Sequence, residues 1–186
     1  PDQDGNGRIV LLKLDGGGAY GGYFDPYDAY PSGQYGAASN EMELLYLNLD
    51  YLADRHVIAH ELEHPLYQER HGWTIPDWPY HNEGLAECAV RAVYGTNETS
   101  LHYFMYDFQG DIGPGLPLVT WQYGNFSQYA QAYMFWSYLA GRMGGVEAFG
   151  RIFAQAGNPS SIELLLQDEL GIGFSDAHRD MKLATW

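Results

Sequence analysis

The pattern of apolar and polar residues changes near residue 50. Before it, two segments have the apolar patterning of β-strands: Arg8–Asp15, which we expect to be buried, and Met42–Asp50. Ala19–Asp25 is a third candidate strand, weakened by its glycines. The N-terminal part of the chain is therefore predicted to form a small β-sheet.

After residue 50 the apolar residues recur at helical spacing, first between Ala53 and Leu62. A second helix is predicted to run to Gly95, with Asn82 as its N-cap and Gly95 as its stop. Further helices are predicted over residues 125–145, 146–156 and 161–170 and from residue 175. Because strands come first and helices follow, the fold class is predicted to be α+β.

Chain length and net charge indicate how many domains to expect and which classes of partner are disfavoured. The 186 residues suit a single domain, and the formal net charge is −15, with lysine only at Lys13 and Lys182. Such a surface repels nucleic acid and anionic lipid, so we expect neither as a partner. No apolar run approaches the roughly 18 residues that cross a bilayer, so membrane insertion is not expected. Cys88 is the single cysteine, which excludes an internal disulfide, and we expect it to be a small core residue.

The segment from His60 to His64 has the form H-E-x-x-H. Residues four apart share one face of a helix, so both histidines can bind one ion, and Glu61 beside them can take a proton from a metal-activated water. Two imidazoles and a carboxylate form the usual open catalytic site of zinc. The alternative is an amphipathic helix that carries histidines by chance, so the third ligand decides between them.

Glu83 is the best candidate for that third ligand. His56 is disfavoured because it lies about 12 Å from His64 along a helix axis, whereas zinc–nitrogen bonds are only about 2 Å long. Eighteen residues separate His64 from Glu83, enough to leave one helix, turn and start a second. Glu87, one turn later, can accept the free N–H of a ligand histidine, His60 being the expected one. An ordinary acidic helix start is the alternative for both glutamates.

H-E-x-x-H, eighteen residues and N-E-G-x-x-E together resemble the gluzincin clan of zinc metallopeptidases. The aminopeptidase-type pattern reads HELEH…NEGLAE here, and the rest of the chain is most similar to the hyicolysin-type secreted metallopeptidases. The matching pieces are DGNGRIVLLKLD, GGYFDPYD, SNEMELLYLN and YAQAYMFWSYL. The resemblance covers most of the chain and is strongest from Ser39 to Gly95.

This resemblance implies a zincin-like metallopeptidase domain over residues 1–186. Its first lobe, about residues 1–80, would hold the sheet and the active-site helix, and its second, about 81–186, would be mostly helical. The resemblance also implies one catalytic zinc ion, a protein or peptide substrate, and a secreted or cell-surface location. In the aminopeptidase type a downstream tyrosine stabilises the oxyanion; the most similar position here is Tyr129, with Tyr123 second and a packing role as the alternative.

Two residues depart from the family pattern. Pro65 follows His64 directly; it lacks an N–H and clashes with the carbonyl of Glu61, so we expect the helix to kink or end there. His81 stands directly before N-E-G, where an apolar residue would be expected. We expect it in a solvated loop, with a place in the cleft as the alternative.

The N-terminal segment DQDGNG has the alternation of a calcium loop. Asp2, Asp4 and Asn6 would supply the ligands, but an EF-hand needs an acidic residue where Lys13 stands, and a strand is predicted to follow. We therefore favour a polar turn before a strand, with calcium binding as the alternative.

Together these features predict a zinc-dependent peptidase in which Glu61 is general base and acid. An endopeptidase is favoured because no group that would hold a substrate terminus can be assigned. Residues 41–47 are expected to form an edge strand that could pair with an extended substrate. The alternatives are a non-catalytic, metal-stabilised extracellular binding module and a zinc hydrolase of a non-peptide amide or ester.

Overall fold

The computed structural model describes residues 5–17, 20–34, 36, 38–51, 55–72, 78–106 and 117–185. Within these residues, seven α-helices accompany one three-stranded sheet, which confirms the α+β class. The chain forms two compact units, residues 1–69 and 70–186, and all three strands belong to the first. No helix of the described part is both long and apolar enough to span a membrane.

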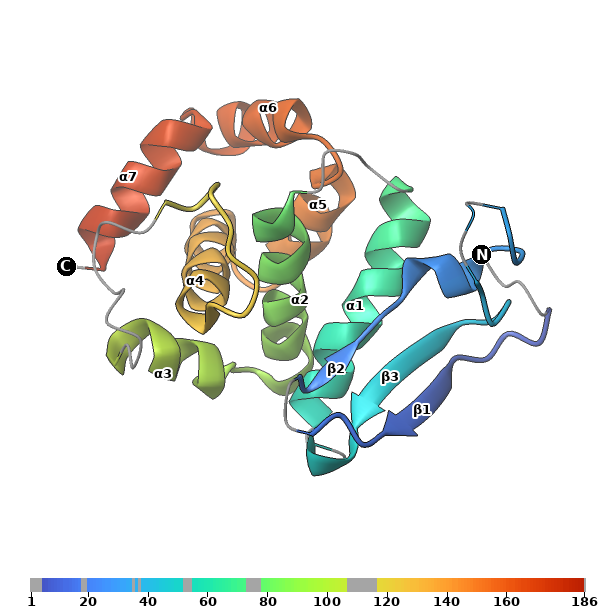
Figure 1. Ribbon diagram of the computed structural model, residues 1–186. Helices are drawn as coiled ribbons and strands as arrows, with labels where there is room; N and C mark the ends of the chain where they lie inside the picture. Colours follow the sequence, from blue (N-terminus) through green and yellow to red (C-terminus); the bar gives the residue numbers. More distant parts are fainter. Residues whose placement is uncertain are drawn as a thin grey trace. The chain divides into compact units, whose positions relative to one another are not determined.

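The sheet of the first unit has the order β1-β3-β2 (Figure 1). β1 (Val10–Leu14) runs parallel to β3 (Leu44–Asn48), and the two-residue β2 (Gly22–Tyr23) runs antiparallel to it on the other side. All five residues of β3 are buried, as a strand between two neighbours should be. The prediction that residues 41–47 form an edge strand is therefore wrong, because β3 is the central strand.

The prediction that β1 is buried is also wrong. Ile9, Val10, Leu11 and Leu12 are 36 to 45% exposed, although they are apolar. Among the described strands β1 pairs only with β3, so it forms an edge of the sheet. An apolar run is typical of a strand, but it does not tell on how many sides that strand is covered.

A buried polar group ties the loop between β2 and β3 to the sheet. Asp28 belongs to a 3-10 turn, Pro26–Ala29, and is only 3% exposed. The Tyr46 hydroxyl of β3 donates to its carboxylate, and Asn40 donates to the same carboxylate from its backbone N–H at 2.8 Å and from Nδ2 at 3.0 Å. The buried charge is thus satisfied by local donors, as burial of a carboxylate requires.

Helix α1 (Arg55–His71) lies beside the sheet and contains Pro65 without ending there (Figure 1). Of the two outcomes predicted at Pro65, the end of the helix is wrong, and the kink stays a prediction. Proline removes one backbone hydrogen bond, here to the carbonyl of Glu61. Packing beyond the proline holds the helix, because Tyr67 and Gln68 are buried and Gln68 Nε2 donates to the Tyr30 hydroxyl at 3.2 Å.

The second unit is built around α4 (Phe126–Arg142), whose Phe135, Trp136 and Leu139 are fully buried. Helices pack against it from several directions (Figure 1): α2 (Pro79–Tyr94), α3 (Glu98–Tyr106), α5 (Ala148–Gln155) and α7 (Phe174–Ala184). α6 (Pro159–Leu170) packs against α5 and α7. Cys88 is buried in this core, as predicted.

Most of these helices match their predicted ranges, with two differences. α3, a helix of nine residues, was not predicted. α2 begins at Pro79, three residues before the predicted N-cap Asn82, and proline suits the first turn because its missing N–H has no partner there anyway. The predicted stop is confirmed, since Gly95 has φ 83° and its N–H bonds to the carbonyl of Arg91.

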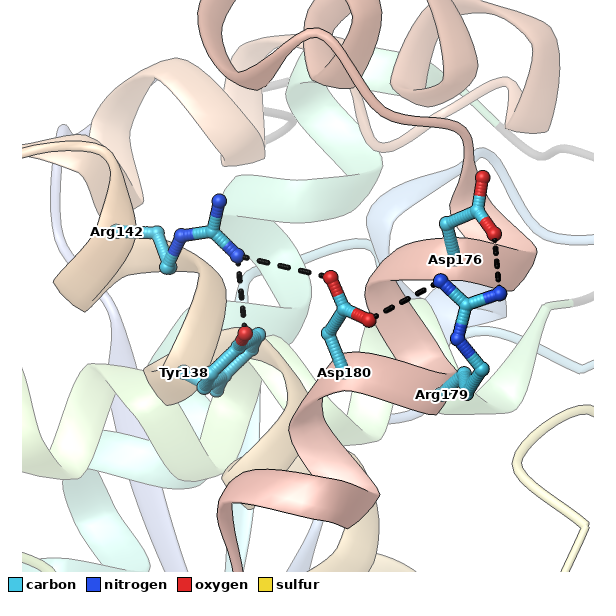
Figure 2. Close-up of polar contacts among 5 residues, drawn as sticks. All are labelled: Tyr138, Arg142, Asp176, Arg179 and Asp180. Carbon is cyan, nitrogen blue, oxygen red and sulfur yellow. Dashed lines mark hydrogen bonds and ion pairs between the residues drawn. The ribbon is translucent and has the colours of Figure 1, made fainter.

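Exposed charged groups join α4 to α7 (Figure 2). Arg142 on α4 donates to the Tyr138 hydroxyl at 3.0 Å and lies 3.9 Å from the Asp180 carboxylate of α7. Arg179 then bridges Asp180 and Asp176, at 3.2 and 2.8 Å. Such exposed pairs are worth little individually, so the buried core of α4 carries most of the packing energy.

Helix α2 is fixed on α4 by a very close approach. A Cβ added at Gly84 would lie 2.7 Å from Trp136 Cδ1 and 2.8 Å from Ala132 Cβ. One turn earlier, the carbonyl of Tyr80 accepts a hydrogen bond from Trp136 Nε1 at 2.7 Å. Glycine is therefore needed at position 84, directly after Glu83, and the buried indole orients the first half of α2.

His81 is a buried residue of α2, so the prediction of a solvated loop is wrong. It is 0% exposed, its ring packs edge-on against those of Tyr80 and Trp136, and its Nδ1 lies 2.5 Å from the carbonyl oxygen of Ala156. Nδ1 must therefore carry the proton. Burial, the largest influence, lowers the pKa of His81 to about 4.

Replacing Gly84 by alanine should destabilise the protein by about 1–3 kcal/mol, because the added methyl group overlaps Trp136 and Ala132. Urea unfolding measures the change. Gly150 of α5 is the matched control: a Cβ there meets nothing within 4 Å, so Gly150→Ala should be neutral or stabilising. Equal behaviour of the two variants would contradict the close approach.

His81 should make stability depend on pH. The folded protein keeps His81 neutral down to a pKa of about 4, whereas in the unfolded chain it binds the proton near the ordinary histidine pKa of about 6.5. Stability is thus fully present above pH 6.5 and falls as the pH drops toward 4, by on the order of 2–3 kcal/mol. Urea unfolding with a chelator at pH 7 to 4.5 should show a weaker pH dependence for His81→Phe than for the native chain. The exposed His102→Phe should keep the native profile.

Candidate metal centre

Helix α1 places two imidazoles one turn apart on one face. The ring centroids of His60 and His64 are 5.0 Å apart, with an angle of 84° between the ring planes. This arrangement follows from the i, i+4 spacing within the continuous helix. Two ring nitrogens can therefore face one point in space, as the sequence predicts.

Glu83 completes a group that could hold a metal ion. One ligand atom each from His60, His64 and Glu83 lie within 4.8 Å of one another, and all three residues are partly buried. Among the residues that the structure describes, no other trio of His, Cys, Asp or Glu meets this condition. Two imidazoles and one carboxylate suit zinc, which accepts nitrogen and oxygen ligands in a site with an open position. His56, on the preceding turn, is not part of the group.

Glu61 is held inside the first unit beside His64. It is 6% exposed, and its Oε2 lies 3.8 Å from His64 Nε2. The backbone of β2 approaches it closely, because a Cβ added at Gly22 would lie 2.8 Å from Glu61 Cγ. This carboxylate is therefore largely shielded from bulk water and lies close to a candidate ligand nitrogen.

Glu63 is a residue that the sequence analysis missed. It is 5% exposed, and its Oε2 lies 3.5 Å from His64 Nδ1. The two nitrogens of His64 thus face two different carboxylates, Nε2 toward Glu61 and Nδ1 toward Glu63. Glu63 occupies a variable position of H-E-x-x-H, so the motif alone does not single it out; its signal is a second glutamate within one turn of the helix.

Glu87 is oriented by the start of α3. Its Oε2 accepts hydrogen bonds from Asn97 Nδ2 at 2.5 Å and from the Ser100 hydroxyl, and both donors are buried. Asn97 Oδ1 in turn accepts from the Ser100 backbone N–H at 3.1 Å, in the manner of a helix cap. Sequence reasoning missed both donors, because α3 itself was not predicted. The contact of Glu87 with His60 stays a prediction.

The positions of Tyr129 and Tyr123 do not test whether either one stabilises the oxyanion. Tyr129 lies on α4, partly buried, with its ring centroid 4.9 Å from that of Trp121. Tyr123 lies before α4, is 65% exposed and meets the same indole edge-on at 6.5 Å. A packing role and a catalytic role both stay open for Tyr129.

The candidate calcium loop lies largely outside the described residues, since Asp2 and Asp4 are not among them. Of its three proposed ligands the structure describes Asn6, whose Oδ1 accepts the Arg8 backbone N–H at 2.7 Å. That bond is typical of the polar turn favoured from the sequence. Calcium binding stays an untested alternative.

A scan against models of known protein families finds no match for this chain, and a search of curated proteins finds none.

Proposed function

We propose that this protein is a zinc-dependent peptidase with a zincin-like catalytic domain. The observation that carries the proposal is the convergence of His60, His64 and Glu83 within 4.8 Å, next to the buried carboxylate of Glu61. A structural metal site needs no proton acceptor at the second position of the motif, whereas a hydrolytic site does. The carboxylate thus favours an enzyme over a binding module.

In this proposal His60, His64 and Glu83 hold the metal. Zinc, when bound, would polarise a substrate carbonyl and make a nearby water more acidic. Glu61 takes the proton of the attacking water and later passes it to the nitrogen of the leaving amine. Its shielding from solvent keeps this proton within the site. Glu87, held in place by Asn97 and Ser100, fixes the orientation of a ligand histidine.

The substrate class we propose is a protein or peptide cleaved within its chain. Tyr129 would donate a hydrogen bond to the oxyanion, as the resemblance implies. The net charge of −15 disfavours polyanionic partners such as nucleic acid. A secreted or cell-surface location is part of the same proposal and rests on the resemblance to the gluzincins.

Glu61→Gln should lower kcat by about 10²–10⁴-fold and leave the zinc content unchanged, because the amide cannot take the proton. The assay is run with and without a chelator. It uses peptides acetylated at the N-terminus and amidated at the C-terminus, which only an endopeptidase cleaves well. Glu69→Gln, an isosteric change at an exposed position of α1, is the control and should keep full activity. Undiminished cleavage by the Glu61 variant would remove Glu61 from this role, and zinc binding without any cleavage would favour the binding module.

Glu83→Gln should weaken zinc binding by more than about 100-fold, because it replaces a charged ligand by a neutral one. Mutation of residues that only hydrogen-bond to metal ligands already weakens binding about 10–100-fold. Competition against a coloured chelator measures the affinity. Glu98→Gln, at the exposed start of α3, should bind zinc as the native chain does. An unchanged affinity of the Glu83 variant would place the third ligand elsewhere.

A further inference from the structure

Glu63 is a carboxylate that the proposed reaction does not use, yet the fold buries it. Its side chain is 5% exposed, and both carboxylate oxygens are shielded from solvent. Burial of a carboxylate is unfavourable unless a donor or a positive charge compensates it. Any donor close to this carboxylate is therefore important for the role of Glu63.

His64 is such a partner within the same helix. Glu63 Oε2 lies 3.5 Å from His64 Nδ1, while Nε2, on the other side of the ring, faces Glu61 at 3.8 Å. A neutral imidazole carries its proton on one nitrogen and offers a lone pair on the other. Glu63 is the nearer of the two carboxylates, so it favours the tautomer with the proton on Nδ1, which leaves the lone pair on Nε2.

We propose that Glu63 is a positioning residue that accepts the Nδ1 proton of His64 and so presents Nε2 of that ring to a divalent metal. The inference rests on the proposed function, because it takes His64 as a metal ligand. The two atoms lie 3.5 Å apart, and a carboxylate that accepts the N–H of a ligand histidine raises the basicity of the ring as well as orienting it. Glu87 and Glu63 would then each orient one of the two histidines.

The test compares zinc affinity in three variants by competition with a coloured chelator. Glu63→Leu removes the acceptor and should weaken zinc binding about 10–100-fold, whereas Glu63→Gln keeps a carbonyl acceptor and should lose less. Gln68→Leu is the matched control: it removes a similarly buried polar group of α1, whose bond goes to Tyr30 and not to His64. It should lower stability in urea without changing the zinc affinity.

The cobalt-substituted proteins give a second readout that a purely structural role would not move. The visible absorption of bound Co²⁺ reports ligand geometry, so it should shift in the Glu63 variants and stay native in Gln68→Leu. If Glu63→Leu does not fold, Glu63→Gln carries the test, with a several-fold loss expected.

Three results separate failure of this inference from failure of the proposed function. Native zinc affinity and a native cobalt spectrum in the Glu63 variants, with a native chain that does bind zinc, would overturn the role of Glu63 alone. Equal weakening in Glu63→Leu and Gln68→Leu would do the same, because it would show a general effect of α1 packing. A native chain that binds no zinc would overturn the metal centre itself and the inference with it.

Discussion

The contact between Gly84 and the indole of Trp136 is the constraint on which the second unit depends. At this point α2 and α4 approach so closely that only a hydrogen atom fits on the glycine Cα. The indole N–H also donates a hydrogen bond to the carbonyl of Tyr80. The same side chain therefore sets both the distance between α2 and α4 and the rotation of α2 about its axis. Glu83 directly precedes the glycine, so the buried core of α4 helps to set its position.

Helix α1, unlike α4, buries carboxylate side chains. Several of its inward-facing residues are polar or ionisable, with Glu61 and Glu63 both nearly inaccessible to solvent. Buried carboxylates favour the bound state of a cation, because the cation offsets their lost hydration. The chain would then couple metal binding to folding, so that the free energy of unfolding includes part of the free energy of binding. A helix of this composition is understandable for a metal site and unusual for an ordinary core.

The features that the sequence predicts correctly are those that neighbouring residues determine. The i, i+4 histidines, the glycine stop of α2 and the three strands were predicted because a few neighbouring residues determine them. The exposure of β1, the burial of His81 and the hydrogen bonds from Asn97 and Ser100 to Glu87 depend on partners distant in the chain. Pro65 is the opposite case: the local rule allowed the helix to end there, but the helix continues and buries Tyr67 and Gln68 beyond the proline.

The exposed strand β1 has a consequence for handling the protein. Its apolar side chains face solvent at one edge of the described sheet, and such an edge is a template for pairing with another copy. Lys13 is the single charged residue within the strand, so little on the strand itself blocks self-association. Mutual repulsion between molecules that each carry a charge of −15 is then the main protection. Colloidal stability should therefore be poorest where that repulsion is weakest, near the isoelectric point and in concentrated salt.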